Sequence, residues 1–223
     1  MDEGRNMMKR IGLMIIALGL PLVLCGPARA QHAGPYGGVF LGGNALMSAK
    51  GSDSQGDFSL KFDPGLMGSA VLGWDFEPGN TAGEGRIELE YSHRSNRLDK
   101  ATFAEGSVAA SGNVTADSLL LNFYGILFGD RSWSPYLGLG LGAARIEASD
   151  LRVTGQPLSG DSAFTFAYQA GLGVDYALSD HLNLDLGYRF FGAVRPNLRE
   201  ADGTDFRMDY YNHSVVLGLR VGF

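Results

Sequence analysis

The chain ends in RMDYYNHSVVLGLRVGF (residues 207–223), and this stretch decides the fold class. From Tyr211 onward every second residue is apolar or aromatic, broken only by His213, and mostly small or polar residues stand between them. A period of two predicts a β-strand with one apolar face and one polar or small face. In water the apolar face would need a covering layer, whereas in a membrane barrel lipid covers it.

The start of the chain predicts export. Lys9 and Arg10 precede an apolar run over residues 11–24, and Ala28 and Ala30 then supply small residues at the two positions that a signal peptidase reads. The run of fourteen residues is shorter than the roughly 20 residues that a membrane-spanning helix needs. We therefore predict a cleaved signal peptide over residues 1–30 and a mature domain over residues 31–223.

Two features of this leader leave alternatives open. Residues 2 and 3 are acidic where a signal peptide is normally basic, so Met7 and Met8 are alternative starts to Met1. Cys25 raises the alternative of a lipoprotein, but Leu24 stands where a lipidation signal has a small residue. Cleavage after Ala30 is therefore the preferred interpretation.

The composition of the mature domain excludes several function classes. Removing residues 1–30 takes away four basic and two acidic residues, which changes the formal net charge from −6 to −8. This acidic balance argues against nucleic acid as a partner. Removal of the leader also discards the single cysteine, so the mature chain has no disulfide or thiol chemistry. Glycine, at 33 of 223 residues, is about twice its usual share and favours a β-protein with many turns.

The alternation of the last strand recurs along the mature domain. It is most regular in residues 86–91, where charged residues alternate with apolar ones, as expected for a strand with one wet face. The predicted strands cover approximately residues 36–48, 66–76, 86–91, 118–127, 135–146, 164–178, 182–190 and 211–223.

The connections between these strands alternate in length. Short turns are predicted at residues 77–85, 129–134 and 179–181, and long polar loops at 49–63, 93–112, 147–163 and 192–209. Aromatic residues near strand ends are predicted to lie at the membrane interfaces. They are Tyr36, Trp74, Phe76, Phe128, Trp133, Tyr136, Tyr176, Phe190 and Tyr211. The fold class predicted is all-β, an eight-stranded antiparallel up-and-down transmembrane β-barrel, with its long loops outside the cell.

A soluble sandwich or lipocalin-like barrel is the main alternative fold, because both also alternate. In either, the charged face would form the core and the face rich in Phe, Leu and Tyr would meet water, at a cost of several kcal/mol for each unpaired buried charge. A membrane barrel removes both problems by placing the charges in its interior. The predicted interior charge network consists of Arg86, Glu88, Glu90, Asp175, Asp185, Arg189 and Arg220.

Several stretches resemble the small outer-membrane β-barrel superfamily, a porin-like family that includes the OmpA transmembrane domain, OmpX-like proteins and Opa-like surface antigens. They are GPYGGVFLGG (residues 34–43), PYLGLGLG (135–142), YQAGLGVDY (168–176) and LRVGF (219–223). The resemblance implies location in the outer membrane of a Gram-negative bacterium, among lipid and lipopolysaccharide. It also implies transient contact with periplasmic chaperones and with the barrel-assembly machinery. The family's terminal assembly signal matches Val215, Leu217, Leu219, Val221 and Phe223.

Little in the sequence predicts chemistry beyond the barrel. The interior charges favour ion pairs that fill the lumen, because a barrel of eight strands holds only its own side chains. A narrow gated channel for small solutes is the alternative. Arg145 lies on the apolar phase near the loop end, where it would meet lipopolysaccharide phosphates. No cofactor is predicted: no two His residues have metal-ligand spacing, and the Gly-x-Gly runs lie in strands with no following helix.

A lipid A-modifying enzyme is a further alternative, because some small barrels carry a Ser/His pair at the outer rim. The candidates are His213 with Ser214 and Ser92 with His93. Neighbours on one strand point to opposite faces, so neither pair can share a proton, and we predict no enzymatic activity. The function predicted is structural, or a surface interaction of the adhesion or antigen type with a host or surface ligand through the long loops.

Overall fold

The computed structural model describes residues 33–53, 56–76, 84–103, 106–127, 132–194, 196–199 and 205–223. Within these ranges the regular structure is entirely β-strand. None of these residues belongs to a helix long and apolar enough to cross a membrane. The predicted signal peptide, its cleavage residues Ala28 and Ala30 and the alternative start positions lie outside the described residues.

Eight strands of the described chain close into a ring of antiparallel neighbours. Around the ring the order is β1, β4, β5, β6, β7, β9, β10 and β13, and β13 pairs with β1 again. Each strand therefore pairs with its neighbour along the chain, which confirms the predicted eight-stranded up-and-down topology. The ring strands are β1 (Gly34–Leu46), β4 (Gly65–Asp75), β5 (Glu84–Phe103), β6 (Gly106–Ile126), β7 (Trp133–Val153), β9 (Ser162–Ala177), β10 (Leu182–Ala193) and β13 (Tyr210–Gly222).

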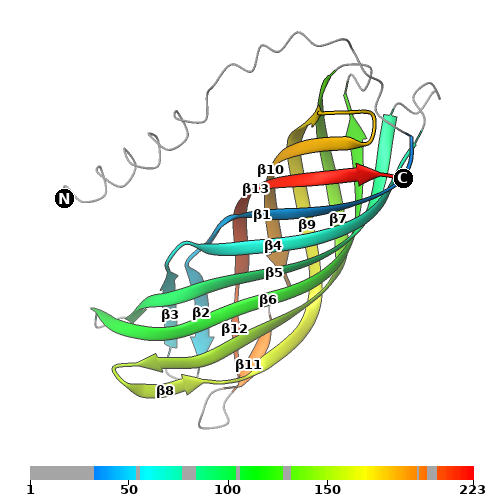
Figure 1. Ribbon diagram of the computed structural model, residues 1–223. Helices are drawn as coiled ribbons and strands as arrows, with labels where there is room; N and C mark the ends of the chain where they lie inside the picture. Colours follow the sequence, from blue (N-terminus) through cyan, green and yellow to red (C-terminus); the bar gives the residue numbers. More distant parts are fainter. Residues whose placement is uncertain are drawn as a thin grey trace.

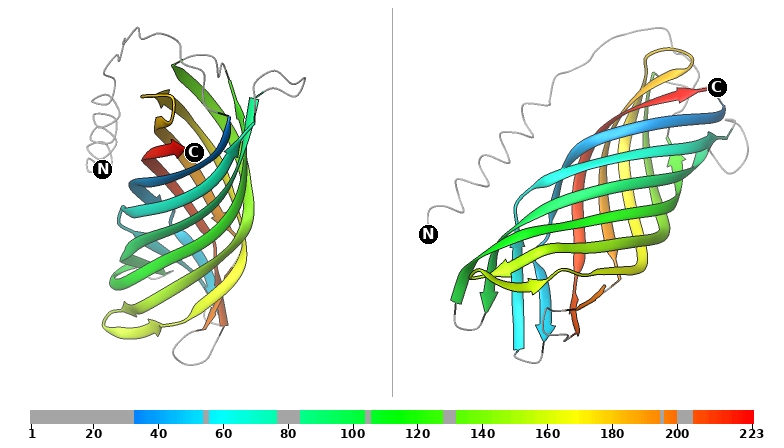
Figure 2. Two further views of the ribbon diagram at one scale, coloured as in Figure 1. Left: turned by 45° about the vertical axis from the view of Figure 1, so that its right-hand side comes forward. Right: turned by 60° about the horizontal axis from the view of Figure 1, so that its bottom comes forward.

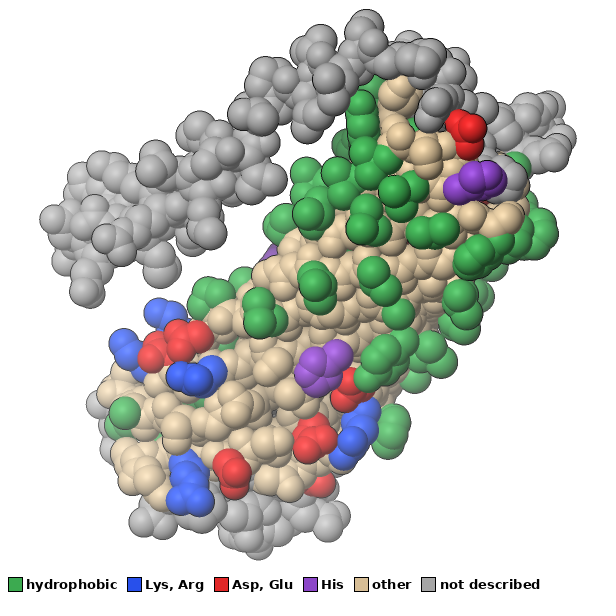
Figure 3. Space-filling view, in the orientation of Figure 1, with side chains coloured by type: hydrophobic (Ala, Val, Ile, Leu, Met, Phe, Trp, Pro, Cys, Tyr) green, Lys and Arg blue, Asp and Glu red, His purple; other side chains and the backbone are tan. Residues whose placement is uncertain are grey.

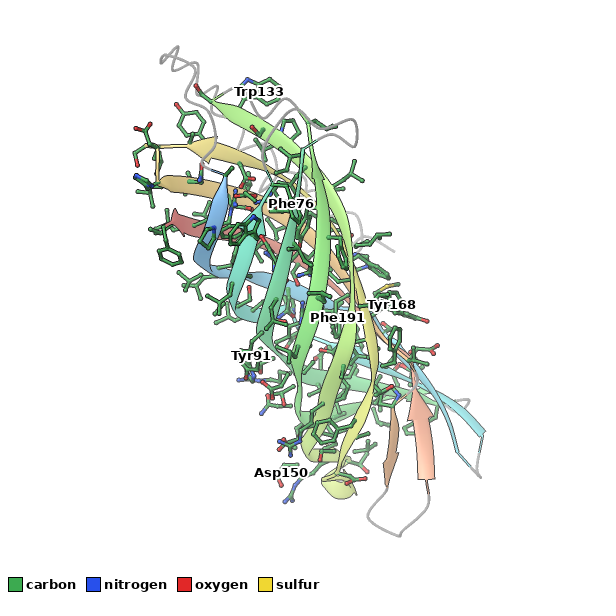
Figure 4. All side chains as sticks on the ribbon, turned by 90° about the vertical axis from the view of Figure 1, so that its right-hand side faces the viewer. Phe76, Tyr91, Trp133, Asp150, Tyr168 and Phe191 are labelled. Carbon is green, nitrogen blue, oxygen red and sulfur yellow. The ribbon has the colours of Figure 1, made fainter. Side chains whose placement is uncertain are left out.

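The two ends of the ring differ. At one end, here named the turn end, β1 begins and β13 finishes, with Tyr36 opposite Gly222. The connections from β4 to β5, from β6 to β7 and from β9 to β10 lie at this same end, near the C-terminus in Figure 1. At the opposite end, here named the hairpin end, the strands project unevenly, as both views of Figure 2 show. In Figure 4, Phe76 and Trp133 lie toward the turn end and Asp150 lies at the hairpin end.

The hairpin end corrects the prediction of long loops. Segments predicted as loops are largely paired strands: β5, β6 and β7 run on through them, and short strands fill the rest. The short strands are β2 (Ala49–Asp53), β3 (Gly56–Phe62), β8 (Gln156–Ser159), β11 (Asn197–Arg199) and β12 (Asp205–Met208). The physical reason is burial, because Leu60, Leu98 and Leu151 in these segments point inward and are enclosed.

A band of apolar side chains surrounds the outside of the ring. Leu41, Leu139 and Leu172 are each more than half exposed, and the same phase continues on every ring strand. Figure 3 shows these apolar side chains over the middle of the barrel and toward the turn end, while charged side chains gather at the hairpin end. We call this band the belt. Its outward phase matches the prediction that lipid, not protein, covers the apolar face.

The inside of the ring is packed by large side chains set against glycines. The Tyr136 ring lies over Gly173 of β9, and the Phe40 ring lies over Gly218 of β13. Tyr36 and Tyr136 are therefore buried inside, which corrects their predicted place at the membrane interface. Both stand at positions of their strands whose side chains point inward. Alternation along the strand therefore predicts their location better than nearness to a strand end does. Phe128, assigned to the same interface, lies outside the described residues.

Candidate functional site

The lumen contains every charged residue that the sequence places there. None of the seven exposes more than 3% of its surface: they are Arg86, Glu88, Glu90, Asp175, Asp185, Arg189 and Arg220. They come from β5, β9, β10 and β13, and alternation along each strand points them inward. We call this set, with Asp75 and Arg94, the lumenal charge network.

The part of the network nearest the turn end is organised around one carboxylate. Asp175 Oδ2 accepts a hydrogen bond from Arg86 Nη2 at 2.6 Å, and Arg220 Nη2 lies 2.7 Å from the same oxygen. Tyr136 donates its hydroxyl hydrogen to Asp185 Oδ1 at 2.7 Å, and its ring lies 4.5 Å from the guanidinium carbon of Arg86. The charge-assisted hydrogen bond from Arg86 and the ion pair with Arg220 hold both arginines in position across the lumen.

The middle of the lumen holds a second group. Glu90 pairs with Arg189, and its other oxygen accepts hydrogen bonds from the amides of Asn122 and Gln169. Arg94 donates to Ser92 Oγ at 2.7 Å and to Gln169 Oε1 at 2.9 Å. These contacts join β5, β6, β9 and β10 across the interior.

Sequence reasoning missed two members of the network. Arg94 falls in a segment predicted as a loop, yet it is fully buried, and its guanidinium carbon lies 4.1 Å from the centre of the Phe191 ring. Asp75, at the end of β4, accepts from Arg220 Nη1 at 3.4 Å. The signal was available, because Arg94 continues the inward phase of Arg86 and Asp75 lies next to the outward Trp74.

Beyond the network, Asn212 donates to the buried Asn44 and Asn96, and the rest of the interior is largely apolar. The apolar side chains there come from all eight ring strands except β4, and also from β2 and β3, and they form one cluster that we call the hairpin-end core. Its buried members are Leu46, Ala49, Leu60, Phe62, Leu98, Ala101, Val114, Ala116, Leu120, Ala144, Ile146, Ala148, Leu151, Ala167, Phe191, Ala193 and Tyr210. Phe191 is where this core meets Arg94 of the charge network. The lumen is thus filled by ionised groups toward one end and by packed apolar groups toward the other.

Outside the barrel, a row of charged side chains borders the belt on β5, β6 and β7. His93, Asp117 and Arg145 are cross-strand neighbours in one row. Asp117 Oδ1 accepts from the Tyr91 hydroxyl at 2.8 Å and from His93 Nδ1 at 2.9 Å. Arg145 Nη2 lies 3.0 Å from Glu147 Oε2. We call His93, Asp117, Arg145 and Glu147 the outer charged cluster.

The outer charged cluster lies on the hairpin-end side of the belt, next to the belt row of Tyr91, Leu119, Ala143 and Phe166. Burial alone would raise the pKa of the Asp117 carboxyl. The hydrogen bonds from His93 and Tyr91 outweigh burial and hold that pKa below its usual value. The Asp117 carboxylate therefore already accepts hydrogen bonds from two side chains.

The predicted Ser/His candidates are not brought together. Ser92 and Ser214 are buried and point into the lumen, whereas His93 and His213 lie on the outer face. His213 instead has its Nδ1 atom 2.6 Å from the Tyr188 hydroxyl. Across the described ranges, no group of three or more His, Cys, Asp or Glu side chains is arranged to hold a metal ion.

Comparisons with known proteins agree with this architecture. The family model for the outer membrane protein beta-barrel domain matches residues 17–223. The outer membrane protein OprG from Pseudomonas aeruginosa is 13% identical, over 87% of this chain and 99% of that one, with a TM-score of 0.54. Neisserial surface protein A is 18% identical, over 83% of this chain and 97% of that one, with a TM-score of 0.47.

A third similar structure is that of the outer membrane enzyme PagL, 16% identical over 81% of this chain and 99% of that one, with a TM-score of 0.36. No curated protein sequence matches the chain. At such identities the similarity concerns the fold alone, and the neighbours, which include a surface protein and an enzyme, do not fix a function. The family match spans nearly the whole chain, and this protein therefore belongs to the outer membrane protein beta-barrel domain family and is located in the outer membrane.

Proposed function

We propose that this barrel does not conduct solutes and that it serves as a surface protein, whose hairpin end contacts other molecules outside the cell. The observation that carries the proposal is the hairpin-end core, which fills the interior toward the end at which the strands project beyond the belt. In outer-membrane barrels the longer connections face outward and the short turns face the periplasm, so the hairpin end is the extracellular end.

Two different layers argue against the channel alternative. Toward the periplasmic side, Arg86 and Arg220 converge on Asp175 across the lumen. Further out, Arg94 is packed against Phe191, and the apolar side chains of the hairpin-end core follow. An ion would have to displace charge-assisted hydrogen bonds in the first layer and then enter a close-packed apolar region in the second.

The extracellular part is built to hold side chains in place. Because β5, β6 and β7 continue as paired strands, their outward residues occupy fixed positions. Arg97, Lys100 and Arg152 are among these exposed residues. A surface that is ordered before binding loses less side-chain and backbone freedom on association than a flexible loop does, which favours a binding role.

The binding role is tested by adherence of bacteria that carry the protein, compared with a deletion strain. We expect the deletion to lower adherence to host cells or to purified matrix, and wild-type protein to restore it. A variant with Arg97→Ala, Lys100→Ala and Arg152→Ala should restore less, because three exposed cations of the hairpin end are gone while the buried core is unchanged. Equal adherence of the deletion strain and the wild type would contradict the proposed surface role.

The closed lumen is tested separately, by conductance in planar bilayers. We expect silence from the wild type, and silence also from Arg220→Ala, because the hairpin-end core still closes the lumen when the turn-end charges are disturbed. Discrete openings of the wild-type protein would contradict the proposal and favour the channel.

The proposal includes no enzymatic activity. A lipid A-modifying enzyme would need a serine beside an outward histidine. Ser92 and Ser214, the serines next to His93 and His213 in the sequence, point into the lumen instead. Deacylase and palmitoyl-transfer assays on purified lipopolysaccharide test this point, and product formed by the wild type above a heat-denatured control would overturn it.

A further inference from the structure

The positive and negative groups of the lumenal charge network do not balance. Within the described part of the chain, its buried members are four guanidiniums and five carboxyl groups: Arg86, Arg94, Arg189 and Arg220, and Asp75, Glu88, Glu90, Asp175 and Asp185. If all were ionised, the interior would carry one negative charge without a counterpart (five minus four), which is costly away from water. A single bound proton makes the enclosed set neutral.

The excess of carboxyl groups lies at the turn end. In the middle of the lumen Arg189 pairs with Glu90, and the hydrogen bonds of Arg94 go to neutral hydroxyl and amide oxygens. That leaves two guanidiniums, Arg86 and Arg220, for the four remaining carboxyl groups of the network.

Two of these four carboxyl groups face each other. Asp175 of β9 and Asp185 of β10 are directly opposite in the strand register, and their side chains lie within hydrogen-bond reach of one another. Like charges directly opposite on neighbouring strands repel, and two carboxylates have no hydrogen to share. A proton between them removes the repulsion and supplies the hydrogen.

The contacts of the two groups indicate which of them is the acid. Arg86 and Arg220 both contact Asp175 Oδ2, so Asp175 is the carboxylate of the pair. Its Oδ1 atom is enclosed and has no hydrogen-bond donor among the described residues. Asp185 is further from arginine, because Arg220 Nε lies 3.8 Å from its Oδ2, and its Oδ1 accepts from Tyr136 at 2.7 Å. A protonated Asp185 keeps the contact with Tyr136 and supplies a donor to Asp175.

We propose that Asp175 and Asp185 form a proton-binding site, in which Asp185 is a neutral acid at neutral pH and donates a hydrogen bond to the Asp175 carboxylate. With this proton bound, the charges of the network sum to zero, so the lumen needs no trapped counterion. The site lies inside the barrel, and the inference is therefore independent of the proposed contact of the hairpin end with other molecules. The charged and titratable side chains around the pair are Tyr36, Asp75, Arg86, Glu88, Tyr136 and Arg220.

Infrared spectroscopy tests for this proton directly, because the carbonyl stretch of a protonated carboxyl group is separate from the bands of ionised carboxylates and of backbone amides. The protein is extracted from outer membranes into a detergent without carbonyl groups and measured at neutral pH, where exposed Asp and Glu side chains are ionised. Labelling of aspartate with carbon-13 at its carboxyl carbon distinguishes an aspartic from a glutamic acid. The variant is Asp185→Asn, and the matched control is Asp75→Asn, which alters another buried carboxyl group in contact with Arg220. A heat-modifiability gel confirms that each variant is folded.

We expect a carboxylic-acid band from the wild type that shifts on carbon-13 labelling of aspartate. The band should be absent from Asp185→Asn and present in Asp75→Asn, which leaves the facing pair intact. Absence of the band from the wild type would overturn the proposal. A band that persists in Asp185→Asn or disappears in Asp75→Asn would also overturn it, because the proton would then be held elsewhere.

Urea unfolding in detergent gives a second test. The amide introduced by Asp185→Asn can donate to Asp175 and accept from Tyr136, as the neutral acid does. This variant should therefore shift the urea midpoint far less than Asp175→Asn, which removes the charge between Arg86 and Arg220. An equal or larger loss in Asp185→Asn would show that position 185 needs its negative charge, and the proposal would fail.

Discussion

At the scale of single residues, the lumen depends on mutual compensation of buried charges. Asp175 is the carboxylate on which Arg86 and Arg220 converge. Asp175→Asn keeps the shape and leaves both guanidiniums without that charge, so we expect a loss of about 3–5 kcal/mol in unfolding free energy. Urea unfolding in detergent measures it. Asp150→Asn at the exposed hairpin end is the control, and equal stability of the two variants would show that the network does not hold the barrel together.

The second prediction at the scale of single residues concerns two glycines, one inside the barrel and one on its outer face. A methyl group at Gly173 would lie 2.6 Å from the carbonyl oxygen of Leu186 and would collide with the Tyr136 hydroxyl. At Gly43, on the outer face, it would meet nothing within 4 Å. Gly173→Ala should therefore destabilise the barrel by about 1–3 kcal/mol, and Gly43→Ala should change little. Thermal unfolding monitored by gel mobility compares the two, and equal effects would contradict the close packing of the interior.

At the scale of elements, the ring strands were predictable and the hairpins were not. Strands that cross the belt alternate strongly, because one face meets lipid and the other meets charge, as Leu89 between Glu88 and Glu90 illustrates. Beyond the belt both faces lose that contrast, since outward residues become polar and inward ones are often alanine, such as Ala116 and Ala148. Pairing with neighbouring strands, which one sequence does not display, decides that these segments are strands.

The candidate site divides in the same way. Inward charges followed from phase alone, because alternation assigns a face without knowledge of the partner. The pairings did not follow: Asp117 with His93, or Arg94 with Gln169, depends on register between strands far apart in the sequence. Tyr136 shows the limit of composition, since an aromatic residue near a strand end suits an interface but here fills the lumen.

The last strand carries a prediction of its own. Phe223 ends the apolar series of β13, and we propose that this series is recognised by the barrel-assembly machinery during export. Phe223→Ala should lower the amount of folded, heat-modifiable protein in outer-membrane fractions without lowering synthesis. Leu41→Ala, at a comparably exposed belt position on the adjacent strand, is the control. Equal yields of the two variants would argue against a role for Phe223 in assembly.

At the scale of the whole molecule, the distribution of apolar and charged side chains between inside and outside reverses from the membrane part to the projecting strands. Within the belt, apolar groups face out and ionised groups are enclosed; in the projecting strands, apolar groups are enclosed and charges face out. The reversal follows the solvent, from hydrocarbon to water. One set of continuous strands, β5 to β7, makes both parts, so the hairpin end is joined to the membrane part without a break in the strands.

The direction in which the side chains of the belt point is the central claim, and nitroxide labels on β6 test it most directly. In a Cys25→Ala background, single cysteines replace Leu119, Leu120, Leu121, Asn122 and Phe123 in protein held in lipid bilayers. We predict high collision with membrane-dissolved oxygen at 119, 121 and 123, and low collision at 120 and 122, with a period of two. The opposite phase, or ready access of a water-soluble nickel reagent to 119, 121 and 123, would contradict the account.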